Sequence, residues 1–303
     1  MVNTIVPVNY PVTNSPNNVS DVQRVAEKLL NRDVSPNTLK ALASDMRYFF
    51  KWYSDKNGEE FSFERVLQRD VIDFRDDMQR NDLKPATVNR RLVNVRLLLK
   101  TAVELEIISK NHAEDVKQIA SQSLAPKGLT EQETRKFLKE CELHGTLRDK
   151  MVIHLLLSAG LRASEVIGLT IKDVEITERK GHVTIRRAKG NKQRVVPLGS
   201  RLRELITGYM IIEGPTENLV LGQRGAITQF ALNKLVGKYA AKAGLKVHPH
   251  TLRHVFAFQY LQKNPGDIVG LSQLLGHSSI STTQIYTQNR LEDLAERMEA
   301  VVF

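Results

Sequence analysis

The chain has 303 residues, enough for two domains that each bury a core. Its hydrophobic (41%) and charged (26%) fractions are ordinary for a globular protein, and no apolar run approaches the ~20 residues of a membrane span. The N-terminus does not read as a secretory signal, and the single cysteine, Cys141, excludes an intrachain disulfide or a cysteine metal cluster. Composition therefore excludes membrane and disulfide-rich secreted classes and indicates a cytoplasmic protein.

The formal net charge of +10 is concentrated in the C-terminal part of the chain. Residues 128–303 hold 25 Lys and Arg against 17 Asp and Glu, and residues 179–203 hold nine basic residues and no acid. Such a patch is typical of a protein that binds a polyphosphate such as DNA. A solvated basic surface is the alternative interpretation.

The N-terminal part predicts a small helical domain. Residues 1–18 are expected to form a flexible arm, and residues 19–120 a helical core-binding (DNA-binding) domain. Ser20 is expected to cap the first helix, Ser35-Pro36 to open the second and Gly58 to end it. A shorter helix near residues 71–78 and a long one from Pro85 complete four helices.

The helix from Pro85 carries a polar, basic side that would suit a DNA groove. Its candidate DNA-binding residues are Lys84, Thr87, Arg90, Arg91 and Lys100. An ordinary solvated helix face would have the same composition. A DNA-binding role for this face is therefore favoured only together with the features of the second domain.

Residues 121–128 have linker composition, and residues 129–288 are expected to form a second domain. A capping box, Thr130 with Glu133, opens its first helix. Two alternating, β-branched segments, 182–186 and 194–198, predict a hairpin, and the remainder is expected to be helical. Residues 289–303 predict an amphipathic C-terminal helix. The expected fold class is mainly α (α+β), with a small antiparallel β-sheet.

The second domain carries the residues that metal-free phosphoryl transfer needs. Arg162 follows a helix end at Gly160, and His250 and Arg253 share one face of a helix. Pro249 suits a first-turn position, which adds the positive end of the helix dipole. No further ligands at suitable spacing surround His250, and the chain has no P-loop, so neither a metal nor a cofactor is expected.

The motif at the end of the second domain is the most informative stretch of the sequence. It runs Leu274-Leu-Gly-His-Ser-Ser-Ile-Ser-Thr-Thr-Gln-Ile-Tyr286, with His277 nine residues before Tyr286. Together with residues 160–165, 189–198 and 250–253, it resembles the tyrosine recombinases, the phage-integrase and Xer-type family. The resemblance covers about residues 129–286.

The resemblance implies roles for individual residues. Arg162 and Arg253 would hold the phosphate, His250 would manage protons and position it, His277 would hydrogen-bond it, and Tyr286 would attack it. Lys189, in the hairpin turn, would be the general acid, with Lys192 as the competing candidate, which also joins the DNA-binding set. Glu165 and His254 are expected to support this site.

The resemblance also implies a site-specific recombinase that cuts and rejoins DNA through a 3′-phosphotyrosyl intermediate and a Holliday junction. It would act on a double-stranded recombination site as a homo-tetramer, with a dimer per core site and accessory DNA-bending proteins as further candidate partners. Such an enzyme would be nucleoid-associated. The C-terminal helix would dock on the neighbouring protomer.

Some positions depart from the Xer pattern. Gln288 stands where a histidine is common, residues 264–267 replace a shorter loop, and the N-terminal arm is long. These departures leave room for a mobile-element recombinase (integration, excision or cointegrate resolution) beside Xer-like dimer resolution. Two rival functions are a type IB topoisomerase-like enzyme and a non-catalytic DNA-binding accessory factor.

Overall fold

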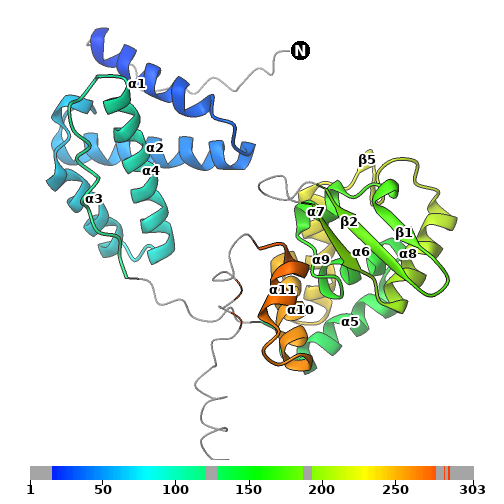
Figure 1. Cartoon of the computed structure of the whole chain (residues 1–303). Coiled ribbons are helices and arrows are strands. Elements are labelled where there is room, and N and C mark those ends of the chain that lie inside the picture. The colour runs from blue at the N-terminus through cyan, green and yellow to red at the C-terminus, as the bar shows by residue number, and fades with distance from the viewer. Residues whose placement is uncertain (1–15, 121–127, 187–192, 278–282, 284–285, 287–303) are drawn as a thin grey trace, which may run out of the picture. The chain divides into compact units, whose positions relative to one another are not determined.

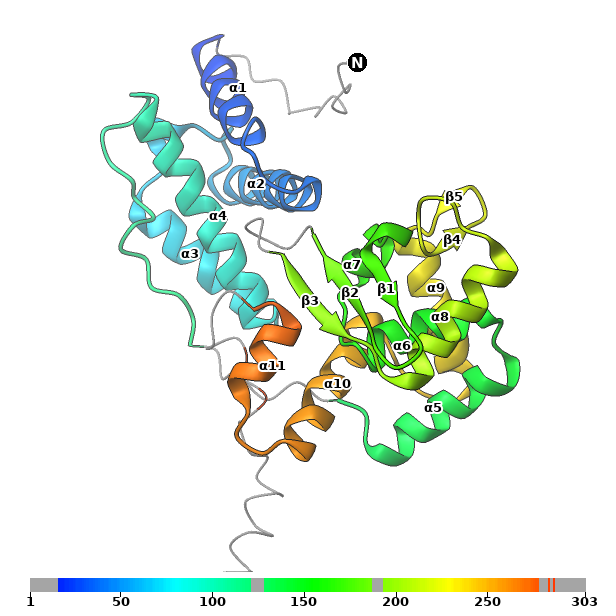
Figure 2. The same cartoon turned by 45° about the vertical axis from the view of Figure 1, so that its right-hand side comes forward.

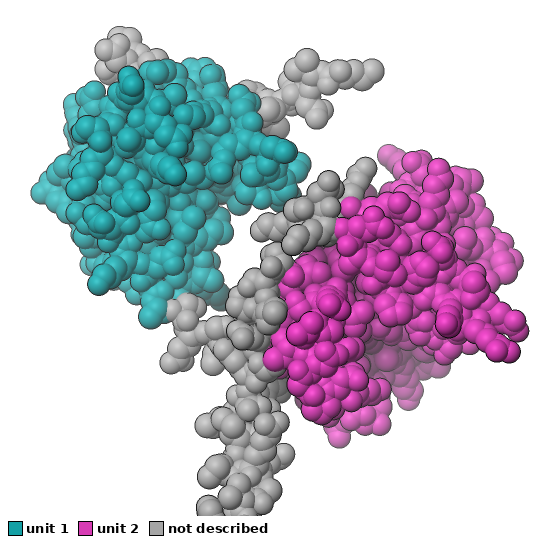
Figure 3. All heavy atoms as spheres, viewed as in Figure 1, with its two compact units in different colours: residues 1–122 teal, residues 123–303 magenta. Residues whose placement is uncertain are grey.

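A computed structural model describes residues 16–120, 128–186 and 193–277, together with Thr283 and Tyr286. The chain divides into two compact units, residues 1–122 and 123–303 (Figure 3). Within the described ranges, no helix is long and apolar enough to cross a membrane.

The described part of unit 1 consists of four α-helices (Figure 1), whose buried apolar side chains form one core. Its helices are α1 (Pro16–Leu30), α2 (Pro36–Asn57), α3 (Gln68–Arg80) and α4 (Pro85–Glu104), with a 3-10 turn at Phe63–Arg65. The predicted caps of α2 are confirmed, because Ser35 accepts a hydrogen bond from the Thr38 amide and Gly58 ends the helix at φ 68°. The predicted start of the first helix at Ser20 is wrong: α1 begins at Pro16, a residue whose fixed φ suits a first turn.

Unit 2 is mostly helical and contains a small sheet. Its helices are α5 (Glu131–His144), α6 (Leu147–Leu157), α7 (Ala163–Gly168), α8 (Ser200–Glu213), α9 (Gln229–Lys242), α10 (Pro249–Lys263) and α11 (Ile268–Leu275). The predicted capping box of α5 is confirmed, since Thr130 and Glu133 exchange side-chain and backbone hydrogen bonds.

The sheet of unit 2 confirms the predicted hairpin and adds a strand. Strands β2 (Gly181–Ile185) and β3 (Arg194–Pro197) pair antiparallel, with Val183 opposite Val196, and β1 (Val174–Ile176) pairs with the other edge of β2 (Figure 2). A two-stranded pair, β4 (Leu221–Gly222) and β5 (Gly225–Ala226), lies in a region that was predicted to be helical. That prediction is wrong there because strands of two or three residues are too short to show an alternating pattern.

Helix α6 is the centre of this unit. Five of its residues, Met151, Val152, Ile153, Leu155 and Leu156, are fully buried, and the helix contacts both α8 and α10. Its C-terminal end leads directly into the turn that carries Arg162. The packing of α6 against α10 therefore fixes two of the predicted site segments relative to each other.

Cys141 lies in this core and is buried, as expected for a small apolar residue. Burial raises the pKa of its thiol to about 12, so the thiol stays protonated at neutral pH.

Candidate active site

The turn between α6 and α7 places Arg162. Gly160 adopts φ +64°, and a Cβ there would overlap the ring of Phe256 on α10, so only glycine fits. Arg162 then caps the N-terminus of α7 in an extended conformation. The close approach of this turn to α10 brings the Arg162 segment against the helix that carries the second predicted arginine.

Glu165 lies at the centre of an arginine cluster. Its carboxylate, 7% exposed as a residue, accepts hydrogen bonds of 2.8 Å from the backbone amide and Nη1 of Arg162. It also accepts two hydrogen bonds of 2.8 Å from Arg194. Burial opposes ionisation, but the Arg194 and Arg162 hydrogen bonds outweigh it and lower the pKa of Glu165 to about 2.

Arg194 was not among the predicted site residues. It begins β3, and its Nε donates to the carbonyl oxygen of Leu274 at 2.8 Å. Its guanidinium also lies against Gly276, where an added Cβ would stand 2.7 Å from Nη1. Strand alternation could have revealed it, because Arg194 lies two residues before the buried Val196 and therefore points inward.

Arg253 is the most deeply buried of the site cations. It is 1% exposed, and its Nη1 donates to the Gly160 carbonyl at 2.6 Å while its Nη2 donates to the Leu275 carbonyl at 2.7 Å. Burial, with Arg162 nearby, lowers the pKa of Arg253 to about 10, which leaves it charged at neutral pH. Its position on α10 follows from Pro249, which opens the helix as predicted.

His277 connects Arg253 to Thr283. Its Nε2 lies 3.2 Å from Nη2 of Arg253, and its Nδ1 lies 2.9 Å from Oγ1 of Thr283. Arginine offers only donors, so Nε2 accepts and Nδ1 carries the proton that it donates to Thr283. Burial and the neighbouring Arg253 lower the pKa of His277 to about 4, consistent with this neutral form.

Tyr286 is buried, with 6% of its surface exposed. Its hydroxyl lies 2.7 Å from Nδ1 of His254, its ring meets Phe258 edge-on, and its amide donates to the Thr283 carbonyl at 3.0 Å. Burial raises the pKa of Tyr286, and Arg253 acts against that rise. The predicted nucleophile is therefore held next to the arginine cluster.

His250 lies in the first turn of α10 and is more exposed than its neighbours. The centroid of its ring is 4.1 Å from that of His254, in an edge-to-face arrangement. Burial, with Arg253 and Arg162, lowers the pKa of His250. Unit 2 thus brings together every predicted catalytic and supporting residue except Lys189, which, like Lys192, lies outside the described residues.

Among the described residues, no three or more His, Cys, Asp or Glu side chains lie together in a way that could hold a metal ion. The guanidinium groups of Arg162 and Arg253 suit an anionic ligand.

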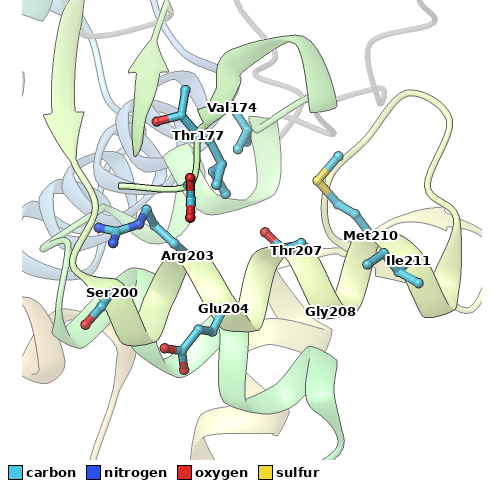
Figure 4. A pocket seen from close by; sticks show the side chains of 11 residues that line it. Val174, Thr177, Ser200, Arg203, Glu204, Thr207, Gly208, Met210 and Ile211 are labelled. Atoms are coloured by element: carbon cyan, nitrogen blue, oxygen red, sulfur yellow. The ribbon is translucent and has the colours of Figure 1, made fainter. Parts of the chain in front are cut away.

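A hollow of about 930 Å³ lies elsewhere on unit 2, between β1 and α8 (Figure 4). Val174 and Thr177 line one side, and Arg203, Thr207 and Met210 line the other. None of the predicted site residues lines this hollow, so its position does not coincide with the chemistry.

The polar side of α4 in unit 1 is partly occupied by contacts within its own domain. Arg90 and Arg91 both pair with Asp45, a carboxylate 2% exposed on α2. The guanidinium of Arg91 also lies 3.6 Å from the centroid of the Tyr48 ring, and its side chain is 17% exposed. The Arg91 side chain is therefore half-buried and already engaged within its own domain, and its role in DNA binding stays a prediction.

The other candidates on α4 are more accessible. Lys84 and Lys100 are exposed, Arg90 keeps 47% of its side chain exposed, and Thr87 is half-buried.

Comparison with known proteins decides the family. Residues 127–292 match the phage integrase family, and residues 23–106 match the phage integrase N-terminal SAM-like domain. The first match alone covers more than half of the chain. The chain belongs to the phage integrase family of tyrosine recombinases. It is therefore a site-specific recombinase that cuts and rejoins DNA strands.

Curated tyrosine recombinases cover almost the full chain. Tyrosine recombinase XerC of Thermodesulfovibrio yellowstonii is 31% identical over 88% of this chain and 90% of that protein. Tyrosine recombinase XerD of Bifidobacterium longum is 29% identical over 88% of this chain and 91% of that protein.

Solved structures of tyrosine recombinases share the fold. XerH recombinase bound to its difH substrate, in a pre-cleavage complex, has a TM-score of 0.70 and 25% identity, covering 92% of this chain and 83% of that one. A lambda integrase dimer bound to a COC′ core site has a TM-score of 0.69 and 17% identity, covering 87% of this chain and 96% of that one.

Proposed function

We propose that this recombinase acts on a double-stranded DNA recombination site, with Tyr286 attacking a phosphodiester to form a 3′-phosphotyrosyl intermediate. The observation that carries this proposal is the chain of contacts from Tyr286 through Thr283, His277 and Arg253 to Glu165. An oxygen nucleophile beside buried guanidinium groups matches the charge that develops on a five-coordinate phosphorus. XerH bound to difH and lambda integrase bound to a core site support DNA as the partner.

The proposed roles follow from charge and hydrogen-bond capacity. Arg162 and Arg253 bind the nonbridging oxygens, because a guanidinium donates two parallel hydrogen bonds and stays charged. His277 and His250 provide further contacts to the phosphate. Glu165 orients Arg162 without neutralising the site, since it shares its single negative charge among three arginines.

The leaving 5′-oxygen needs a proton, which we assign to Lys189 in the β2–β3 turn; Lys192 is the competing candidate. The phosphotyrosine conserves the energy of the phosphodiester, so rejoining needs no ATP. All charge stabilisation proposed here comes from side chains, so cleavage should proceed without a divalent ion.

A covalent-trapping experiment tests this function. On a nicked suicide substrate in excess chelator, the wild-type protein should form a denaturant-resistant DNA adduct, and Tyr286→Phe should form none while it keeps its DNA affinity. An adduct on the Phe variant would reassign the nucleophile. An absolute need for a divalent ion in cleavage would reject the side-chain mechanism. A protein that binds DNA but never forms the adduct would be the non-catalytic accessory factor.

We further propose strand exchange through a Holliday junction in a tetramer, with a dimer on each core site. Residues 289–303, which lie outside the described residues, are proposed to dock on the neighbouring protomer, a head-to-tail contact that can close into a ring. Deleting residues from Leu291 onward should then preserve binding to a single site and abolish synapsis, measured by gel shift and light scattering. A truncated protein that still assembles the synapse would show that the tail packs on its own protomer. Relaxation of supercoiled DNA without synapsis would favour the topoisomerase-like alternative.

The biological role is proposed to be integration, excision or resolution for a mobile element, with Xer-like dimer resolution as the second candidate. The departures at Gln288 and residues 264–267 from the Xer pattern favour the first. Recombination of a plasmid that carries two copies of the cognate site, with and without accessory DNA-bending proteins, distinguishes these outcomes by their products.

A further inference from the structure

The hydroxyl of Tyr286 has a single hydrogen-bond partner among the described residues, which is Nδ1 of His254 at 2.7 Å. The family resemblance implies that His250 handles proton transfer. Among the described residues, however, His250 makes no hydrogen bond to Tyr286. His250 lies one helical turn earlier on α10 and is more exposed. The residue next to the reacting oxygen is therefore His254.

The geometry of this pair is fixed by packing. His254 lies on α10 between residues of the core, and the Tyr286 ring is tilted against it with ring centroids 5.4 Å apart. Phe258, one turn later on the same helix, meets the Tyr286 ring edge-on, also at 5.4 Å. Because Tyr286 is 6% exposed, bulk water has little access to its proton. A base must therefore be a neighbouring side chain.

The surroundings keep the His254 ring neutral. Burial is the main cause that lowers the pKa of His254 to about 4, and three facing groups add to it: His250, Arg253 and His277. At neutral pH one ring nitrogen thus holds a free lone pair. A bound phosphodiester places a negative charge beside Arg253, which offsets the repulsion and makes the imidazole more basic when substrate is present.

We propose that His254 is the general base that takes the phenolic proton as Tyr286 attacks the DNA. The proposal rests on the proposed function of Tyr286. In the step, the O–H bond of Tyr286 breaks and its proton passes to Nδ1 of His254. The phenolic oxygen forms a bond to phosphorus, and the bond from phosphorus to the 5′-oxygen breaks. The 5′-oxygen takes a proton from the general acid, and rejoining reverses every transfer. The step requires the tautomer of His254 that carries its proton on Nε2.

The first experiment compares His254→Asn with a matched control, His250→Asn, in the full-length protein. Asparagine places an oxygen near the position of Nδ1, so it can accept the hydrogen bond of Tyr286 but cannot take its proton. Adduct formation is followed in single turnovers on the suicide substrate at saturating DNA. His254→Asn should slow cleavage by about 10²- to 10⁴-fold. Far-UV circular dichroism checks that the variant is folded, and His254→Gln serves as the second variant if it is not.

Two readouts separate a base from a merely structural residue. The His254→Asn rate should rise about tenfold per pH unit above neutrality, because solvent must then generate the phenolate. The wild-type rate should instead level off. A fluorinated tyrosine of lower phenol pKa at position 286 should reduce the difference in cleavage rate between the wild type and His254→Asn. The proposal is overturned if the cleavage rate of His254→Asn is reduced by a factor that changes with neither pH nor fluorination. It is also overturned if both effects are found in His250→Asn instead.

A third comparison separates His254 from the general acid. When sulfur replaces the 5′-bridging oxygen of the substrate, the leaving group is a thiolate that departs without needing a proton. This substrate should restore the cleavage rate of Lys189→Ala and leave the slow cleavage by His254→Asn unchanged. Rescue of His254→Asn by sulfur would place His254 on the leaving-group side and overturn the proposal. The proposed function has a separate criterion: it fails if Tyr286→Phe still forms the adduct, whereas the outcomes above concern His254 alone.

Discussion

The guanidinium of Arg194 donates two parallel hydrogen bonds of 2.8 Å to the carboxylate of Glu165. The same side chain donates to the Leu274 carbonyl at 2.8 Å, and Glu165 in turn holds Arg162. One buried ion pair thus connects β3, the α7 segment and the end of α11. Lys189, the proposed general acid, precedes β3 by only a few residues in the sequence. The ion pair therefore links the start of β3 to Arg162, a proposed phosphate-binding arginine.

Replacing Arg194 with lysine tests this link. Lysine keeps the positive charge but is a single point donor, so it cannot hold both carboxylate oxygens and the Leu274 carbonyl together. We expect Arg194→Lys to fold, to bind its DNA site with little change in affinity, and to form the covalent adduct about 10- to 100-fold more slowly, the range seen when a residue that orients an active-site ligand is removed. Wild-type cleavage rates in Arg194→Lys would show that charge alone is sufficient at this position.

Gly276 gives a second test of the same cluster, with a matched control in Gly214. Both glycines end a helix in the left-handed region, at φ 63° and 54°, so alanine at either position costs about 1–2 kcal/mol of backbone strain. Only at Gly276 would the new Cβ meet a neighbour, Arg194, whereas nothing lies within 4 Å at Gly214. Gly276→Ala should therefore lose cleavage as well as stability, and Gly214→Ala stability alone, measured by denaturant unfolding and adduct formation. Equal activity in the two variants would contradict the contact with Arg194.

Glu165 makes stability depend on pH. Its pKa falls from 4.5 in the unfolded chain to about 2 in the folded protein, so its stabilising contribution of about 3 kcal/mol is present above pH 4.5 and is lost as the pH falls toward 2. Glu165→Gln should be less stable than wild type at pH 7 by about 3–5 kcal/mol, because three arginines lose their shared carboxylate. The difference in the free energy of unfolding between the wild type and Glu165→Gln should become smaller as the pH falls from 5 to 2.

The measurement has an internal control in Trp52, the only tryptophan in the chain, which lies on α2 of unit 1. Urea unfolding followed by far-UV circular dichroism reports on both units, whereas Trp52 fluorescence reports on unit 1. A difference that stays constant from pH 5 to pH 2 would show that Glu165 is not the titrating group.

Local signals in the sequence predicted much of this fold. Pro249 and the Thr130–Glu133 capping box fixed helix starts, and the β-branched segments around Val183 and Val196 gave the hairpin. Each of these signals depends on residues a few positions apart. The start of α1 and the two- and three-residue strands were missed because their patterns are too short or too weak to detect.

The site residues were predictable as residue types, and their partners were not. His254 and Tyr286 are 32 positions apart, and Arg194 and Glu165 are 29 apart. Strand alternation shows that Arg194 faces inward, and an inward cation needs an acid, but several acids could serve. Only the tertiary structure, which brings the Glu165 carboxylate to the Arg194 guanidinium, selects Glu165. In the same way, the sequence showed Arg91 beside an apolar stripe without showing that Asp45 lies across from it.

The last prediction concerns DNA binding by α4. Because Arg91 packs on Asp45 and Tyr48, Arg91→Gln should destabilise unit 1 by about 1–3 kcal/mol, seen as a shift of the Trp52 fluorescence transition. Lys84 and Lys100 are exposed, so their replacement by Gln should leave that transition within about 0.5 kcal/mol of wild type. If each lysine contacts a phosphate, its replacement should weaken DNA binding and lower the slope of log affinity against log salt concentration by about 1. Unchanged slopes in Lys84→Gln and Lys100→Gln would mean that this side of α4 is an ordinary solvated face and that unit 1 meets DNA through other residues.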